Sequence, residues 1–245
     1  MAQLIAGNWK MNGRTRQAAE LCAALRDGAG GLGCELVVFP PATQLTAVAG
    51  LLAGSPIAVG GQDCHADPDG AHTGDISAGM LRDCGATWVI LGHSERRADH
   101  AEVDDLIRQK VEAAQGEGLR TIVCVGETDE QRATGRETEV VGWQLLGSLP
   151  RDFAGVVAYE PVWAIGSGKT PGIDEVAAMH AFIREELVRQ FAEAGRSVPI
   201  LYGGSVKPGN AADLLAVPEV AGALVGGASL VAVDFLAIAR AARYG

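Results

Sequence analysis

Eight short apolar runs recur along this chain, and their alternation with longer amphipathic stretches restricts the fold more than any other feature. The runs cover residues 4–7, 36–39, 57–60, 88–91, 122–125, 156–159, 200–202 and 223–225. Most are continuous rather than alternating in polarity, which is typical of strands buried on both faces of a parallel sheet. Helical spacing is found between several of the runs, for example over residues 15–26, 103–117, 174–193 and 231–244.

Eight successive strand–helix units predict an α/β protein folded as a single (β/α)₈ barrel. The 245 residues suit one such barrel, and no Pro/Ser-rich linker divides them, so we expect residues 1–245 to form one catalytic domain. A doubly wound sheet is the alternative. It would normally carry a glycine-rich dinucleotide-binding turn after its first strand, and the sequence Gly7-Asn8-Trp9-Lys10 is not such a turn.

The charge and the cysteines restrict the partners and the compartment. A formal net charge of −10 argues against nonspecific binding to nucleic acid or to an anionic membrane surface. An anionic small substrate would need a site built from backbone N–H groups and a few placed cations. The five cysteines show neither CxxC spacing nor the framework of a small secreted fold, and no signal-peptide or membrane-spanning pattern is seen. We therefore expect reduced thiols and a cytoplasmic enzyme.

Polar residues and glycine pairs follow several of the predicted strands. Asn8 and Lys10 follow the first strand, His93 the fourth and Glu160 the sixth. Taken singly, each has a plain structural explanation, such as a surface lysine or a capping histidine. In a barrel, however, all of them lie on the rim formed by the carboxyl ends of the strands, where barrel enzymes place their active sites. The joint placement predicts a functional site there.

Glu160 stands out because of its neighbours on both sides. The apolar strand ends at this carboxylate, and Pro161 prevents it from continuing as a regular central strand. The residues after Pro161 are partly apolar and rich in glycine. This combination predicts a general base beneath a flexible loop.

Five motifs in the same order resemble the triosephosphate isomerase family. They are Ala6–Gly13 (AGNWKMNG), Leu91–Arg97 (LGHSERR), Ala158–Lys169 (AYEPVWAIGSGK), Tyr202–Val206 (YGGSV) and Leu224–Leu230 (LVGGASL). The resemblance runs from about residue 3 to residue 240, and five motifs in register are far more specific than any one of them. It implies a TIM barrel that interconverts dihydroxyacetone phosphate and glyceraldehyde 3-phosphate, a step of glycolysis and gluconeogenesis.

The resemblance also implies a role for each motif residue. Glu160 is the base, and His93 is the electrophile that hydrogen-bonds the carbonyl oxygen and shuttles the hydroxyl protons. Lys10 and Asn8 are the groups that hold the substrate oxygens and offset their charge. The phosphate is bound by Lys10 and by the backbone N–H groups of Gly166, Ser205, Gly226 and Gly227. No metal-ligand spacing is evident, and isomerisation without net redox requires no organic cofactor. A helix N-terminus after His93 favours its neutral form; this enzyme family is itself the standard example of that effect.

A lid, supporting residues and a dimer contact complete the expectations. The lid consists of Pro161, Val162, Trp163, Ala164, Ile165, Gly166, Ser167, Gly168, Lys169, Thr170 and Pro171. Ser94 is expected to cap the helix after His93, Glu95 and Arg96 to form an ion-pair network, Arg97 to be solvated, and Cys124 to pack in the core. The long polar loop 62–77 carries Thr73, which the resemblance places against a partner subunit in a homodimer.

Two other functions stay open at this level. A phosphate-binding aldolase barrel would need a lysine inside a strand for a Schiff base, and no predicted strand has a central lysine. A sugar-phosphate-binding barrel without isomerase activity is the second alternative. Loss of Glu160 or His93 would favour it, and both residues are present.

Overall fold

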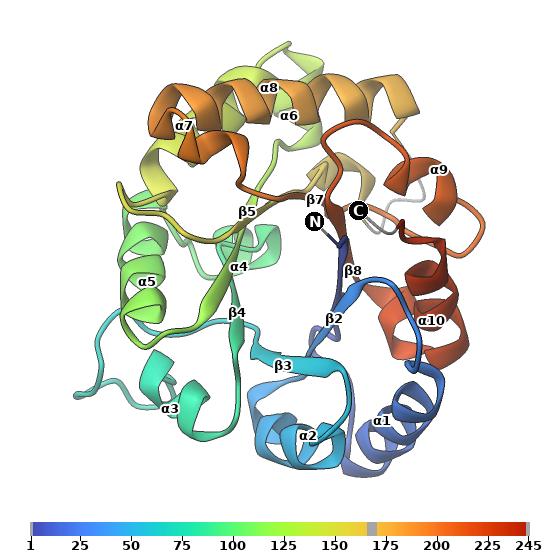
Figure 1. The fold of residues 1–245 in the computed structure, drawn as a ribbon. Helices are drawn as coiled ribbons and strands as arrows, with labels where there is room; N and C mark the ends of the chain where they lie inside the picture. Colours follow the sequence, from blue (N-terminus) through green and yellow to red (C-terminus); the bar gives the residue numbers. More distant parts are fainter. Residues whose placement is uncertain (1, 166–170, 244–245) are drawn as a thin grey trace.

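In a computed structural model that describes residues 2–165 and 171–243, eight parallel strands form a closed barrel (Figure 1). Each strand pairs with the next along the chain, and β8 pairs with β1 to close the sheet. The strands are β1 (Leu4–Asn8), β2 (Glu35–Phe39), β3 (Ile57–Gly61), β4 (Trp88–Leu91), β5 (Arg120–Val125), β6 (Val156–Tyr159), β7 (Ile200–Tyr202) and β8 (Gly222–Val225). The predicted barrel and its eight strand positions are confirmed.

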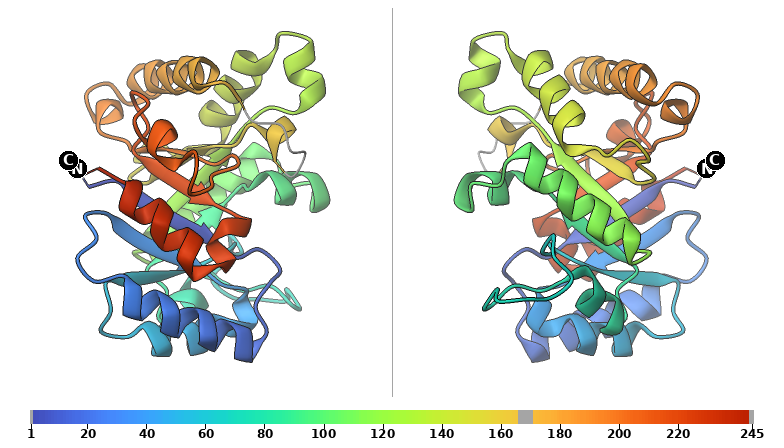
Figure 2. Two further views of the ribbon diagram at one scale, coloured as in Figure 1. Left: turned by 90° about the vertical axis from the view of Figure 1, so that its right-hand side faces the viewer. Right: turned by 90° about the vertical axis from the view of Figure 1, so that its left-hand side faces the viewer.

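The helices surround the barrel on its outside, as Figures 1 and 2 show. The α-helices are α1 (Thr15–Gly28), α2 (Leu45–Leu52), α3 (Ala78–Asp83), α4 (Ser94–Asp99), α5 (Asp104–Gly116), α6 (Asp129–Ala133), α7 (Glu137–Ser148), α8 (Ile173–Phe191), α9 (Ala211–Leu215) and α10 (Ala232–Ala241). Short 3-10 helices are η1 (Ala42–Gln44), η2 (Val162–Ala164), η3 (Ala194–Arg196) and η4 (Gly227–Leu230). Within the described ranges, no helix is both long and apolar enough to cross a bilayer.

The core has two layers because successive residues of each strand point to opposite faces. In β1, for example, Leu4 and Ala6 belong to the inner cluster that fills the barrel, whereas Ile5 packs in the larger cluster between the sheet and the helices. All three side chains are less than 5% exposed. Burial on both faces explains why the strand sequences are continuous apolar runs.

Barrel closure depends on a glycine. Gly222 begins β8 with φ +148°, and a Cβ added there would lie 1.9 Å from the carbonyl oxygen of Leu4 on β1. That distance is far inside van der Waals contact. A side chain at position 222 would therefore push β8 away from β1.

A buried histidine in α8 makes the stability depend on pH. His180 is inaccessible to solvent, its Nδ1 lies 3.3 Å from the carbonyl oxygen of Glu219, and its Nε2 has no partner among the described residues. Burial lowers the pKa of His180 to about 4. The unfolded chain, with a pKa near 6.5, therefore binds a proton that the folded chain does not bind between these values. Stability contributed by neutral His180 is present above about pH 6.5 and is lost as the pH falls towards 4.

We expect His180 alone to make the free energy of unfolding about 2–3 kcal/mol smaller at pH 4.5 than at pH 7.5. His180→Asn should show a weaker pH dependence over this range, because Asn can donate to the Glu219 carbonyl and does not titrate. Urea unfolding of both proteins at pH 4.5 and pH 7.5, at one fixed protein concentration, measures the difference. Equal pH dependence in the two proteins would contradict the assignment.

Candidate active site

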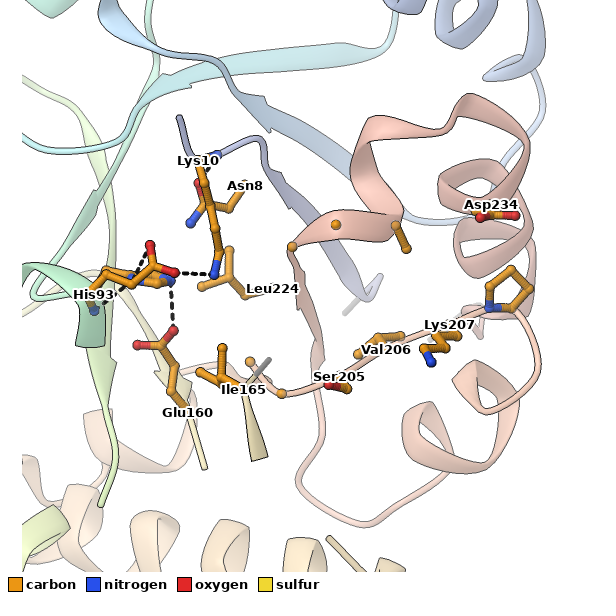
Figure 3. A pocket seen from close by; sticks show the side chains of 17 residues that line it. Asn8, Lys10, His93, Glu160, Ile165, Ser205, Val206, Lys207, Leu224 and Asp234 are labelled. Atoms are coloured by element: carbon orange, nitrogen blue, oxygen red, sulfur yellow. Dashed lines mark hydrogen bonds and ion pairs between the residues drawn. The ribbon is translucent and has the colours of Figure 1, made fainter. Parts of the chain in front are cut away.

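A cavity of about 660 Å³ opens at the carboxyl ends of the strands. Figure 3 shows His93, Glu160, Lys10 and Asn8 gathered at one end of it. Gly203, Gly204, Ser205, Gly226 and Gly227 line it as well, and the side chains of Ile165 and Leu224 lie on its wall. The rim residues predicted to meet, from β1, β4, β6, β7 and β8, line one cavity.

His93 follows β4 and is the N-cap residue of α4. Its backbone is extended (φ −52°, ψ 141°), and its Nδ1 accepts a hydrogen bond from the backbone N–H of Glu95 at 3.2 Å. The prediction that Ser94 caps this helix is wrong, because Ser94 is already its first helical residue. Ser94 supports the site differently, since its backbone N–H donates to Oε2 of Glu160 at 2.9 Å.

The cap determines which nitrogen of His93 can donate. An Nδ1 that accepts a hydrogen bond carries no proton, so the arrangement is that of the neutral ring with its proton on Nε2. Nε2 lies 2.9 Å from Oε1 of Glu160. Burial, the largest influence, lowers the pKa of His93, but the Glu160 carboxylate outweighs it and the pKa lies above its ordinary value. A substrate that separates the two groups removes the influence that raises this pKa.

Glu160 directly follows β6 and is 2% exposed. Burial by itself would raise the pKa of its carboxyl group. The His93 ring, the Ser94 N–H and the charge of Lys10 together outweigh burial and hold the pKa below its ordinary value. Glu160 is therefore ionised at neutral pH and available as a base.

Lys10 extends across the cavity from the loop after β1. Its backbone has φ +52°, an uncommon value for a residue with a side chain. Two contacts hold this conformation: Asn8 Oδ1 accepts from the Lys10 N–H at 3.0 Å, and Gln62 Nε2 donates to the Lys10 carbonyl at 2.8 Å. The Lys10 ammonium is paired with Glu95. The strained backbone thus places a cation close to His93.

The far end of the cavity is built from backbone and small side chains. A Cβ at Gly203 would lie 3.0 Å from Cγ of Glu160, and one at Gly204 would lie 2.2 Å from the Tyr202 hydroxyl. Glycine at these positions lets the backbone after β7 pack closely against Glu160 and Tyr202. Lys207 and Asp234 also line this end, which the motif resemblance did not predict.

The first part of the expected lid rests on a buried carboxylate that sequence reasoning missed. Oε1 of Glu127 accepts hydrogen bonds from Trp163 Nε1 at 2.8 Å and from the Tyr159 hydroxyl at 3.0 Å. Arg132 pairs with Glu127 and lies over the Trp163 ring. The sequence could have indicated a role for Glu127, because it lies just after β5, on the same rim as the other site residues.

The backbone of Glu160 also packs closely against Gly126, which follows the neighbouring strand β5. A Cβ added to Gly126 would lie 1.7 Å from the backbone carbonyl oxygen of Glu160. Gly126 is fixed in turn by Gln144, whose side chain bonds both its N–H and its carbonyl. Only glycine fits at this point without displacing the base.

Glu95 and Arg96 both form ion pairs near the site, as predicted, but not with each other. Glu95 pairs with Lys10, whereas Arg96 pairs with Asp63 at 2.9 Å and with Glu102 at 2.7 Å. Asp63 is also bound by the buried Lys110. This network links the base of loop 62–77 to the helix that His93 caps.

Arg97 is not solvated as expected. Its guanidinium donates to the carbonyl oxygens of Gly92 and Cys124 and pairs with Asp104. Cys124 itself is fully buried as predicted, and burial raises the pKa of its thiol well above the ordinary value. All five cysteines are free thiols.

Some predicted residues lie apart from the cavity or outside the described ranges. Thr73 is exposed on loop 62–77 and does not line the cavity of its own chain. Gly166, Ser167, Gly168, Lys169 and Thr170 lie outside the described residues, so the proposed phosphate contact of Gly166 stays a prediction. Pro171, at the end of the expected lid, is buried.

Comparison with known proteins gives a consistent result over the whole chain. The family model described as triosephosphate isomerase matches residues 3–242. A triosephosphate isomerase of Granulibacter bethesdensis is 64% identical over 98% of this chain and 99% of its own length. One from Acidiphilium cryptum is 57% identical over 99% of both chains. The crystal structure of triosephosphate isomerase from Bartonella henselae superimposes with a TM-score of 0.91 at 45% identity, covering 98% of this chain and 99% of that one.

Proposed function

This chain belongs to the triosephosphate isomerase family and interconverts dihydroxyacetone phosphate and D-glyceraldehyde 3-phosphate; we propose that Glu160 and His93 carry out the chemistry. The observation that supports these roles is the direct contact between Glu160 and His93. A buried carboxylate and an imidazole Nε2–H lie 2.9 Å apart, beside a lysine, at one end of a cavity whose other end is lined by glycines.

The reaction moves one proton between adjacent carbons and one between the oxygens that those carbons carry. Glu160 removes a proton from the carbon next to the carbonyl, and negative charge develops on the carbonyl oxygen. The Nε2–H of His93 hydrogen-bonds that oxygen, and Lys10 offsets its charge. His93 passes the hydroxyl proton from the neighbouring oxygen to the former carbonyl oxygen, and Glu160 returns its proton to the neighbouring carbon. Together the two transfers complete an aldose–ketose exchange through an enediolate.

The substrate must first break the contact between base and electrophile. Both carboxylate oxygens of Glu160 are occupied, one by His93 and one by the Ser94 N–H. We propose that the bound substrate enters between Glu160 and His93, so that each contacts the substrate in place of the other. Asn8, at the end of β1, holds the substrate oxygens from the opposite side.

The phosphate occupies the glycine-lined end of the cavity in this proposal. Backbone N–H groups of Ser205, Gly226 and Gly227, at the ends of β7 and β8, bind the dianion without a large local positive charge. Gly166 adds a further N–H from the lid, residues 161–171. The lid excludes water while the enediolate exists, and the Glu127–Trp163 hydrogen bond anchors its first part.

A coupled assay tests the function. The purified chain should convert D-glyceraldehyde 3-phosphate to dihydroxyacetone phosphate, detected as NADH oxidation by added glycerol-3-phosphate dehydrogenase. Isotope exchange in ²H₂O should place one solvent deuteron on the product carbon, as expected for an enediolate intermediate. Phosphate-dependent binding without turnover would instead indicate a barrel that binds sugar phosphates and lacks isomerase activity.

We also propose that the enzyme is a homodimer that acts in the cytoplasm. Thr73 is exposed on a loop that projects from the barrel (Figure 2), and Met11, near Lys10, is 96% exposed despite being apolar. Contact between loop 62–77 of one subunit and the region around Met11 of the other would cover both. Five free thiols are in keeping with a reducing compartment.

Thr73→Arg is expected to weaken the dimer and to lower activity at low protein concentration, because it introduces a bulky charge into the proposed contact. Sedimentation velocity at micromolar concentration, with activity measured over the same dilution series, checks both effects. A wild-type protein that is active as a monomer at micromolar concentration would contradict the dimer.

A further inference from the structure

Arg97 lies in the last turn of α4, and its side chain reaches two neighbouring strands of the barrel. Only 16% of the side chain is exposed. Its Nε donates to the carbonyl oxygen of Gly92 at 2.9 Å, and its Nη2 donates to that of Cys124 at 3.2 Å. Gly92 directly follows β4, and Cys124 is the last residue but one of β5. One guanidinium therefore binds the carboxyl ends of both strands.

The guanidinium joins β4 and β5 beyond the point where their pairing ends. The paired register of the two strands ends with Leu91 opposite Val123. The next residue, Gly92, has φ +67°, which residues with side chains rarely adopt, and a Cβ there would lie 3.3 Å from Nη2 of Arg97. Glycine at this position therefore lets the backbone turn away from the sheet and lets the guanidinium lie close to it.

Two residues on the surrounding helices fix the orientation of the guanidinium. Nη1 of Arg97 pairs with Oδ1 of Asp104, in the first turn of α5. Nη2 donates to Oγ of Ser148, the last residue of α7, at 3.1 Å, and that hydroxyl donates to the same Asp104 oxygen at 3.0 Å. Asp104 offsets the positive charge. These four directed contacts use the planar fork of N–H groups that a lysine ammonium does not have.

The two strand ends that Arg97 joins position the two proposed reacting groups. The Gly92 carbonyl belongs to the peptide group that leads into His93, so Arg97 fixes that peptide. On β5, the Val125 carbonyl accepts the backbone N–H of Glu160 at 2.8 Å. The position of His93 relative to Glu160 therefore depends on how β4 and β5 are joined at this edge.

We propose that Arg97 is a positioning residue for the isomerisation, because it holds His93 in the place relative to Glu160 that proton transfer requires. This inference rests on the catalytic roles proposed above for His93 and Glu160. Arg97 is not one of the described residues that line the cavity. It acts through the backbone on both sides of His93, with Gly92 before it and α4 after it.

Replacing Arg97 with Lys tests the role of the fork, because Lys keeps the charge but has only one nitrogen for the two carbonyl groups and Asp104. We expect kcat to fall about 10- to 100-fold, the order of loss that displacement of a catalytic group by up to about 1 Å causes. KM should change little, because the phosphate end of the cavity is untouched. Arg108→Lys is the matched control, since Arg108 pairs with Asp105 on its own helix, and kcat should stay unchanged.

A double-mutant cycle with His93→Asn separates positioning from a general structural effect. Where the electrophile is already lost, Arg97→Lys should lower kcat no further, because both substitutions act through the same group. Ser148→Ala removes one of the four contacts and is expected to lower kcat about two- to fivefold, a smaller displacement, and again only when His93 is present. Circular dichroism checks that each variant is folded.

The results distinguish this inference from the proposed role of His93. Normal kcat in folded Arg97→Lys would overturn the inference, and so would an equal loss of kcat with and without His93. If Arg97→Lys does not fold, the cycle between Ser148→Ala and His93→Asn decides in the same way. Normal turnover in His93→Asn alone would instead contradict the role of His93.

Discussion

Replacing Glu160 with Gln is expected to lower kcat by about 10²- to 10⁴-fold, the range that a general base contributes. Gln keeps the size of the side chain and can accept the Ser94 N–H, but its amide does not take a proton at neutral pH. KM should change much less than kcat, because the phosphate end of the cavity is untouched. Steady-state kinetics in both reaction directions measure the effect.

Glu160→Asp sharpens the same test. The carboxylate stays ionised but is withdrawn by one methylene from a position where both its oxygens make 2.9 Å contacts. Misplacement on this scale is expected to lower kcat by about 10²-fold. Glu130→Gln, on the exposed face of α6, is the matched control and should leave kcat unchanged. Normal turnover in Glu160→Asp would show that the proton is carried by another group.

Replacing His93 has the second-largest expected effect, and the choice of substitution separates its two roles. His93 caps α4 through Nδ1 and faces the reacting centre through Nε2. Asn is a good N-cap residue, so His93→Asn should retain the hydrogen bond from the Glu95 N–H. It is too short to place a donor where Nε2 lies. We expect kcat and kcat/KM to fall together by about 10²- to 10³-fold.

His93→Ala should show the same kinetic loss together with lower stability. Removal of the cap is expected to cost about 1 kcal/mol in the free energy of unfolding, which His93→Asn should largely avoid. Kinetics and urea unfolding of the two variants measure the two roles separately. Equal stability of both variants would mean that the Nδ1 contact contributes nothing to the helix, and unchanged turnover in His93→Asn would exclude the electrophilic role.

The sequence predicted the barrel because burial on both faces of each strand leaves a direct mark, the continuous apolar run. It predicted Glu160, His93, Lys10 and Asn8 because each stands just past such a run, where the carboxyl ends of the strands converge. The motif resemblance then assigned their roles. The positions of the strands, and of the residues that directly follow them, can be read from local sequence patterns.

Contacts between distant segments were predicted poorly. Gln62 supports the Lys10 backbone and Glu127 anchors Trp163, yet in the sequence both are ordinary polar residues after a strand. Ser94 was expected to cap α4 because serine is the commoner cap. The helix instead begins one residue earlier than that expectation required, so His93 takes the position. Arg97 was expected in solvent because charged residues on short helices usually are. The sequence does not show that the carbonyl groups of Gly92 and Cys124, at the ends of β4 and β5, lie close to it in the fold.

The contact between Gly126 and the Glu160 carbonyl has a consequence for engineering this scaffold. Barrel loops are commonly exchanged as independent modules, one strand-to-helix segment at a time. Here the segments after β5 and β6 touch, since even a Cβ at position 126 would lie 1.7 Å from that carbonyl oxygen, so an exchange of either segment must keep glycine at position 126. A chimera that takes its β6 segment from one parent should take Gly126 and its partner Gln144 from the same parent. Recombination boundaries are better placed before β5 and after the lid than between them.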